Sequence, residues 1–208
     1  MIRANHSHRR FVLASLVAIS AGLAVLIAAP ASLAQESIVQ LDRAQTKIEF
    51  SLSGTMHTVH GTFALKSSSI QFDPSNGKIS GAIVVDATSG ESRNSSRDAR
   101  MHREILESAK FPEIVFTPMQ MTGAVAAEGA SKVEVSGRFR LHGQDHDVTL
   151  PADVKVDGRN VQIAAHIDIP YVRWGLKNPS NFFLRVSDMV AIEIHAAGHM
   201  ESAGPSQQ

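Results

Sequence analysis

Histidine pairs are the first residues in this chain whose type and spacing raise the question of metal binding. Eight of the ten histidines follow residue 34. In a strand, the spacing of His57 and His60 would send the two rings to opposite faces. His195 and His199 would share a face, but four strand residues span about 13 Å, which is too far for one ion. These pairs therefore predict no metal site.

A turn joins two further histidines, His142 and His146, and they could approach each other there. No third ligand is evident beside them, and structural metal sites need more than two. We expect surface histidines. A histidine-based enzyme or metal protein stays open as an alternative, and it would require the convergence of His57, His102, His142 or His146.

Four arginines, at positions 93, 97, 100 and 103, crowd the start of a predicted helix. Guanidinium groups beside a helix N-terminus suit a phosphate or pyrophosphate. The alternative is a solvated helix face on which these arginines pair with Asp98, Glu104 or Glu107. Arg97 and Arg100 are the candidates for a charged head group.

Nucleophilic catalysis finds little support. The chain has no cysteine, no G-x-S-x-G segment and no carboxylate pair of the glycosidase kind. We expect a protein that is not an enzyme and needs no cofactor.

The arginines belong to the one amphipathic helix that the sequence predicts after its N-terminal segment, residues 96–109. Ser95 and Asp98 fit a capping pattern, and Met101, Ile105 and Ala109 continue an apolar stripe with His102 and Leu106. The helix should end at Phe111, because the residue before a proline is disfavoured in the α region.

Apolar and polar residues alternate over most of the remaining chain, which predicts about eight to ten strands. An antiparallel all-β barrel or sandwich with one helix packing on or closing it follows from this pattern. The expected strands are residues 47–53, 59–65, 79–85, 113–122, 132–141, 146–150, 152–156, 160–169 and 190–196.

The inward positions of these strands combine large and small residues. Phenylalanine and methionine supply bulk, while glycine and alanine, as at Gly81 and Ala165, recur at the same parity. Such a mixture either packs a solid interior or lines an elongated apolar cavity, which an eight-stranded barrel can hold. The residues leave both interpretations open.

The N-terminal segment, residues 1–34, has the pattern of a cleaved signal peptide: early arginines, an uncharged apolar run and small residues ending at Ala34. An uncleaved anchor is the alternative. Cleavage leaves 17 basic and 20 acidic residues, and a net charge near −3 argues against nucleic acid as a partner. We expect one domain over residues 35–200 and a disordered tail over residues 201–208.

An ordered set of short motifs, from about Ile38 to Ala197, resembles the YceI-like family of exported, lipocalin-like, polyisoprenoid-binding proteins. Arg97-Asp98 with Met101-His102, followed by Phe111-Pro112-Glu113-Ile114-Val115-Phe116, is the most specific part. The other matching pieces are Leu41-Asp42 with Ile48-Glu49-Phe50, Thr58-Val59-His60-Gly61-Thr62-Phe63, Asp73–Ile79 with Val84-Val85-Asp86, Gly137 with Leu141-His142-Gly143, Val148-Thr149-Leu150, Trp174-Gly175, and Val186-Ser187-Asp188 with Val190 and Ile192.

This resemblance implies a lipocalin-like barrel around an apolar tunnel for a long isoprenoid or similar lipid, without catalysis. It also implies a periplasmic or secreted location, a homodimer, transient contact with membranes and a link to stress response. Trp174 stands where many relatives carry phenylalanine, so we expect a bulkier ring near the tunnel that shortens it.

The resulting hypothesis is a barrel that binds, and transports or stores, a polyprenyl phosphate or the tail of a quinone. A structural or partner-docking envelope protein with a filled barrel is the alternative. The residues expected to line the tunnel are Phe50, Phe63, Ile83, Val85, Met101, Ile105, Phe116, Phe139, Trp174 and Phe183.

Overall fold

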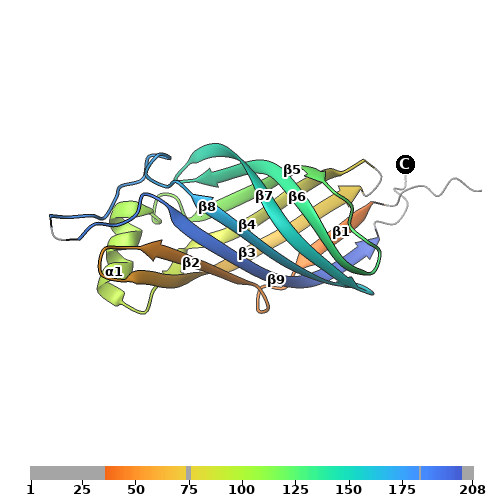
Figure 1. Ribbon diagram of the computed structural model, residues 1–208, viewed down its shortest axis with the longest axis horizontal. Coiled ribbons are helices and arrows are strands. Elements are labelled where there is room, and N and C mark those ends of the chain that lie inside the picture. Colours follow the sequence, from red (N-terminus) through yellow and green to blue (C-terminus); the bar gives the residue numbers. More distant parts are fainter. Residues whose placement is uncertain (1–35, 74–75, 183, 203–208) are drawn as a thin grey trace, which may run out of the picture. The chain divides into compact units, whose positions relative to one another are not determined.

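Alternating apolar and polar residues form nine strands in the computed structural model, which describes residues 36–73, 76–182 and 184–202 (Figure 1). The predicted signal peptide, residues 203–208 of the tail and Phe183 lie outside the described residues. The elements are β1 Ser37–Leu41, β2 Lys47–Ser53, β3 Thr58–Asp73, β4 Lys78–Glu91, α1 Ser95–Arg100, the π-helical segment η1 Met101–Ile105, β5 Glu113–Thr122, β6 Gly129–Leu141, β7 Gln144–Asp157, β8 Asn160–Ile169 and β9 Val190–Ser202.

Every strand pairs antiparallel with its neighbours, and the sheet closes into a barrel. The order is β1-β3-β2-β9-β8-β7-β6-β5-β4, and a β3–β4 pairing completes the ring. Both β1 and β2 lie between β3 and β9 and pair with each of them. The two short strands therefore follow one another along a single strand position of the barrel. The barrel therefore has eight strand positions, which confirms the predicted eight-stranded antiparallel barrel. Strand β9 includes Glu201 and Ser202, which the sequence had assigned to the tail.

A short loop, residues 42–46, separates β1 from β2 within their shared position. The Asp42 carboxylate accepts hydrogen bonds from the backbone N–H of Ala44 at 2.7 Å and from the side chain of Gln45 at 2.9 Å. These hydrogen bonds lower the pKa of Asp42, and the bond from Gln45 has the largest effect. The Thr46 hydroxyl donates to the Asp42 carbonyl oxygen at 2.7 Å. The loop is thus held by its own polar groups and returns the chain to the same edge of β3.

Strand β7 runs through Pro151, whereas the sequence predicted two strands that end on either side of it. Pro151 faces Glu134 of β6 in the register, but the pairing of β7 with β8 begins only at Ala152, opposite Ala165. A proline cannot donate to a sheet hydrogen bond, so it is tolerated where one side of the strand has no partner. The half of β7 that precedes Pro151 thus pairs with β6 but not with β8.

The helix differs from the prediction at both ends. Its N-cap is Asn94, whose side chain accepts from the backbone N–H of Arg97 at 3.0 Å, and not Ser95. After Arg100 the helix widens to π geometry and ends at Ile105, not Ala109. Glu107 has a φ of 44°, and its carbonyl oxygen accepts from the backbone N–H groups of Lys110 and Phe111. Asn94 is an equally good cap by type, and the tight turn at Glu107 ends the helical hydrogen bonding.

The buried core divides into two clusters inside the barrel. One, with Phe72, Ile79, Met121 and Val133, lies where β3, β4, β5 and β6 meet the end of the barrel opposite α1. The other, with Leu141, Ile169, Tyr171 and Leu176, lies at the end that carries α1. No helical segment of the described chain has the length and apolar character needed to cross a bilayer.

Candidate apolar binding cavity

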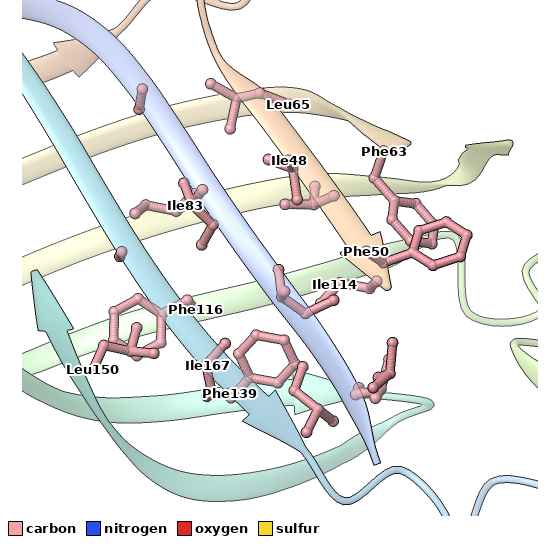
Figure 2. Close-up of a pocket in the computed structure, with 18 of the residues that line it drawn as sticks. Ile48, Phe50, Phe63, Leu65, Ile83, Ile114, Phe116, Phe139, Leu150 and Ile167 are labelled. Carbon is pink, nitrogen blue, oxygen red and sulfur yellow. The ribbon is translucent and has the colours of Figure 1, made fainter. Parts of the chain in front are cut away.

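A cavity of about 410 Å³ runs inside the barrel between these two clusters. Its walls are the inward positions of the strands, because alternate residues of a strand face the same side. Figure 2 shows Ile48, Leu65, Ile83, Phe116 and Ile167, from five different strands, directed into this space. The volume lies in the range of about 300–1,000 Å³ that is typical of ligand pockets. The structure thus decides between the two interpretations of the interior: it is hollow and apolar.

Eight of the ten residues predicted to line a tunnel do line this cavity, and they come from β2, β3, β4, α1's extension η1, β5 and β6. Phe50 and Phe63 form a tilted aromatic pair with their ring centroids 5.4 Å apart, as Figure 2 shows. Phe183 lies outside the described residues. The eight are Phe50, Phe63, Ile83, Val85, Met101, Ile105, Phe116 and Phe139.

Trp174, the remaining predicted lining residue, does not line the cavity. Its ring stacks on His146 of β7 with centroids 4.0 Å apart and planes within 3°. Residues 171–175 form consecutive turns in which Tyr171 and Leu176 take the inward, buried positions and Trp174 lies between them. The ring therefore packs against His146 and against Phe139, whose ring centroid lies 5.7 Å away, and the expectation that Trp174 lines the tunnel is wrong.

The inward residues of this loop, Tyr171 and Leu176, are cavity residues that the sequence reasoning missed. The Tyr171 hydroxyl donates to the Ser187 carbonyl oxygen at 2.7 Å. Burial raises the pKa of the phenol to about 12. Both residues follow β8 in a segment without strand or helix periodicity, so alternation could not have identified them.

Polar groups occur on the cavity wall mainly near α1. Arg97 and Arg100 both reach the wall, but each also has a protein partner. The Arg97 guanidinium donates to the hydroxyl and the carbonyl oxygen of Ser92, at 2.7 and 2.6 Å. Arg100 pairs with Glu104 at 3.2 Å.

Carboxylates at this end balance part of the arginine charge. Burial raises the pKa of Asp98, but hydrogen bonds from the hydroxyl and backbone N–H of Ser92 outweigh it and leave the pKa below its ordinary value. The side chains of Arg103 and Arg100 donate to Glu104 and lower its pKa as well. The two predicted head-group residues are thus placed together at one end of the cavity, in a network that is already charge-paired.

The histidines named in the metal hypothesis lie in separate environments. His57 lines the cavity, and His102 bonds the Gly90 carbonyl oxygen at 2.8 Å. His142 contacts Glu107 at 2.5 Å, while His146 stacks on the tryptophan. Within residues 36–73, 76–182 and 184–202, no three histidine, aspartate or glutamate side chains are grouped to hold a metal ion.

Comparison with known proteins gives matches over most of the barrel. The family model described as the YceI-like domain matches residues 39–197. A UPF0312 protein of Vibrio vulnificus is 28% identical over 139 residues, which cover 65% of this chain and 71% of that protein.

Two solved structures have the same fold. BcnA of Burkholderia cenocepacia superposes with a TM-score of 0.64 at 18% identity, covering 76% of this chain and 98% of that chain. A domain from Saccharophagus degradans, described as polyisoprenoid binding and implicated in plant cell wall breakdown, gives a TM-score of 0.61 at 17% identity, with coverage of 78% and 98%. At these identities the likeness concerns the barrel itself.

Proposed function

We propose that this chain, which belongs to the YceI-like domain family, binds the tail of a long isoprenoid-type lipid inside its barrel and carries or stores it. The observation that supports this most directly is the apolar cavity of about 410 Å³. The polyisoprenoid-binding description of the Saccharophagus degradans domain, which has the same fold, points the same way. Binding without chemical conversion of the lipid is the proposed role.

The cavity favours a long, flexible and apolar guest for a physical reason. Each buried methylene contributes about 0.8 kcal/mol, so about ten of them contribute roughly 8 kcal/mol before ordering costs. Phe50 on β2, together with Phe116 and Phe139, which face each other across the β5–β6 pair, supplies aromatic surface to the cavity wall. No polar partner is needed along the tail, which agrees with the apolar inward positions.

The head group of the lipid would lie at the α1 end, beside Arg97 and Arg100. A polyprenyl phosphate would have to compete with Ser92 and Glu104 for these guanidinium groups. A quinone needs only a hydrogen-bond donor, which either arginine can supply while keeping its protein partner. The proposal therefore includes both head groups. We also propose that the protein acts in the periplasm or after secretion.

Native mass spectrometry with lipid extraction, on protein purified from its exporting host, tests the proposal. Ala165 lines the cavity and Ala164, on the same strand, does not. We expect Ala165→Phe to lower the lipid-bound fraction and the uptake of added prenyl lipid severalfold. Ala164→Phe, the matched control, should behave as the unchanged protein. An isoprenoid or quinone mass lost on extraction identifies the guest.

A lipid-free mass after gentle purification, with no uptake of added prenyl lipids, would overturn the lipid-carrier proposal. The cavity would then be a property of the fold without a ligand, and a partner-docking role would take precedence.

A further inference from the structure

Two loops at the α1 end of the barrel carry the most exposed large apolar side chains in the described chain. Met56, in the turn between β2 and β3, is 81% exposed, and Phe182, between β8 and β9, is 94% exposed. We call residues 54–57, 178–182 and 184–186 the mouth loops. The loop between β8 and β9 extends well beyond the barrel on the side where α1 lies (Figure 1).

Backbone hydrogen bonds fasten the mouth loops to each other. Gly54 and Val186 form an antiparallel bridge, and the Thr55 N–H donates to the Arg185 carbonyl oxygen at 2.9 Å. The Arg185 N–H donates to the Thr55 hydroxyl at 3.1 Å. The two exposed side chains are thus presented by one connected rim and not by two independent loops.

This rim is continuous with the cavity. Gly54 and His57 from the first mouth loop, and Pro179, Leu184 and Val186 from the second, all line the cavity wall. An apolar chain that leaves the cavity at this end would therefore pass between the mouth loops.

The charges of the barrel are distributed unevenly in favour of this end. The α1 end, taken as residues 54–57, 92–112 and 170–189, contains eight arginines and lysines and four acidic residues. The rest of residues 36–202 contains nine arginines and lysines and sixteen acidic residues. The α1 end is therefore net positive and the remainder net negative. Apolar residues beside cationic ones match the interface of a bilayer with anionic head groups.

We propose that the mouth loops dock on an anionic lipid bilayer, with Met56 and Phe182 inserting at the interface while the net-positive end of the barrel faces the head groups. A bilayer fits this rim better than a protein partner because the exposed apolar residues lie in loops that also line the wall of an apolar cavity. The purpose of docking, transfer of a lipid between bilayer and cavity, rests on the proposed function, but its test does not.

Trp174 makes the orientation measurable, because it is the single tryptophan of the chain and lies in the loop between β8 and β9. Quenching of its fluorescence by brominated lipids reports contact between the α1 end and the bilayer. We expect quenching with vesicles of phosphatidylglycerol and phosphatidylcholine, and little with phosphatidylcholine alone. The chain is used as purified, with the same N-terminus in every variant, so that any binding through that segment is common to all.

Loss of the apolar tips should weaken binding selectively. We expect Met56→Ser with Phe182→Ser to reduce vesicle affinity by tenfold or more, since two apolar side chains lose their burial. The control Met119→Ser, also at an exposed methionine but on β5, should stay within twofold. Arg185→Gln, in a mouth loop, should lower the vesicle affinity a few fold more than Lys155→Gln on β7 does. In 1 M salt the affinities of these two variants should be equal.

The docking proposal is overturned if the unchanged protein shows no quenching of Trp174, or if the two-site variant and Met119→Ser bind vesicles equally. Native mass spectrometry of the same samples separates this from the carrier proposal. Retained lipid without vesicle binding rejects docking alone, whereas vesicle binding by a chain that never carries lipid rejects only the carrier function.

Discussion

Gly61 offers a sharp test of how tightly the aromatic end of the cavity is packed. It faces Phe50 directly across the β2–β3 pair. A Cβ atom added at Gly61 would lie 2.3 Å from the Glu91 carbonyl oxygen and 2.3 Å from Cζ of Phe50. Ordinary contacts of such an atom begin at 3.4 Å, so Gly61→Ala requires the ring and the neighbouring backbone to move by about 1 Å.

The expected cost follows from two opposing contributions. Overpacking a tight interior destabilises by about 1–3 kcal/mol, and Phe50, at 6% exposure and in contact with Phe63, has little room to move away. Replacing glycine in a strand returns about 0.5–1 kcal/mol of backbone entropy. The net loss is about 1–2 kcal/mol, which for a domain of this size lowers Tm by about 2–8 °C.

Calorimetry and urea unfolding of Gly61→Ala, alone and combined with Phe50→Leu, measure this loss and locate its source. If the ring is the obstacle, the double variant should be more stable than the sum of the two single changes predicts. If the Glu91 carbonyl oxygen is the obstacle, the effects should add. A Gly61→Ala protein that melts at or above the Tm of the unchanged chain would refute the packing argument.

Two pH-dependent predictions concern single side chains. Tyr171 is the only tyrosine, so we expect tyrosinate absorbance to rise with a midpoint near pH 12 in the folded protein and near pH 10 in denaturant. Because the folded pKa is the higher one, the free energy of unfolding should fall as the pH rises between those two values. A midpoint near pH 10 in the folded chain would contradict the burial argument. The Nδ1 atom of His166 contacts Glu193 at 2.6 Å, which raises the pKa of His166. The contribution of this ion pair to stability is complete below about pH 6.5 and is lost as the pH rises through the higher pKa of folded His166. The loss should be less than about 1 kcal/mol, because the two side chains are about half exposed. NMR titration should show the pKa of His166 falling in Glu193→Gln, and an unchanged pKa would reject the pairing.

The barrel could be predicted because its inward and outward positions alternate so regularly. The expected bounds of residues 47–53, 113–122 and 160–169 coincide with β2, β5 and β8. Alternation could not reveal that β7 continues through Pro151, because the reason lies in the missing β8 partner and not in the local sequence. It also could not show that β1 and β2 share one position, which depends on pairing with β3 and β9.

The cavity residues divide along the same line. Phe50, Ile83 and Phe116 were predictable from strand parity, since a strand fixes which side chains face inward. Trp174 and Tyr171 lie in a run of turns, where parity has no meaning, and only the fold shows that the tyrosine faces inward and the tryptophan packs on His146. The helix cap was misplaced by one residue because Asn94 and Ser95 are similar capping types.

Closure of the ring sets an order of events during synthesis. Strand β9 pairs with β8 and also with β1 and β2, as in the register of Ser202 with Ser37. The inner faces of eight strands therefore cannot be sealed from water until residues 190–202 have left the ribosome. A chain that ends before residue 190 has unpaired edges on β8, β1 and β2, and such edges favour pairing with other chains. The thirteen-residue strand β9 is thus the element whose pairing completes the ring and shields the interior from water.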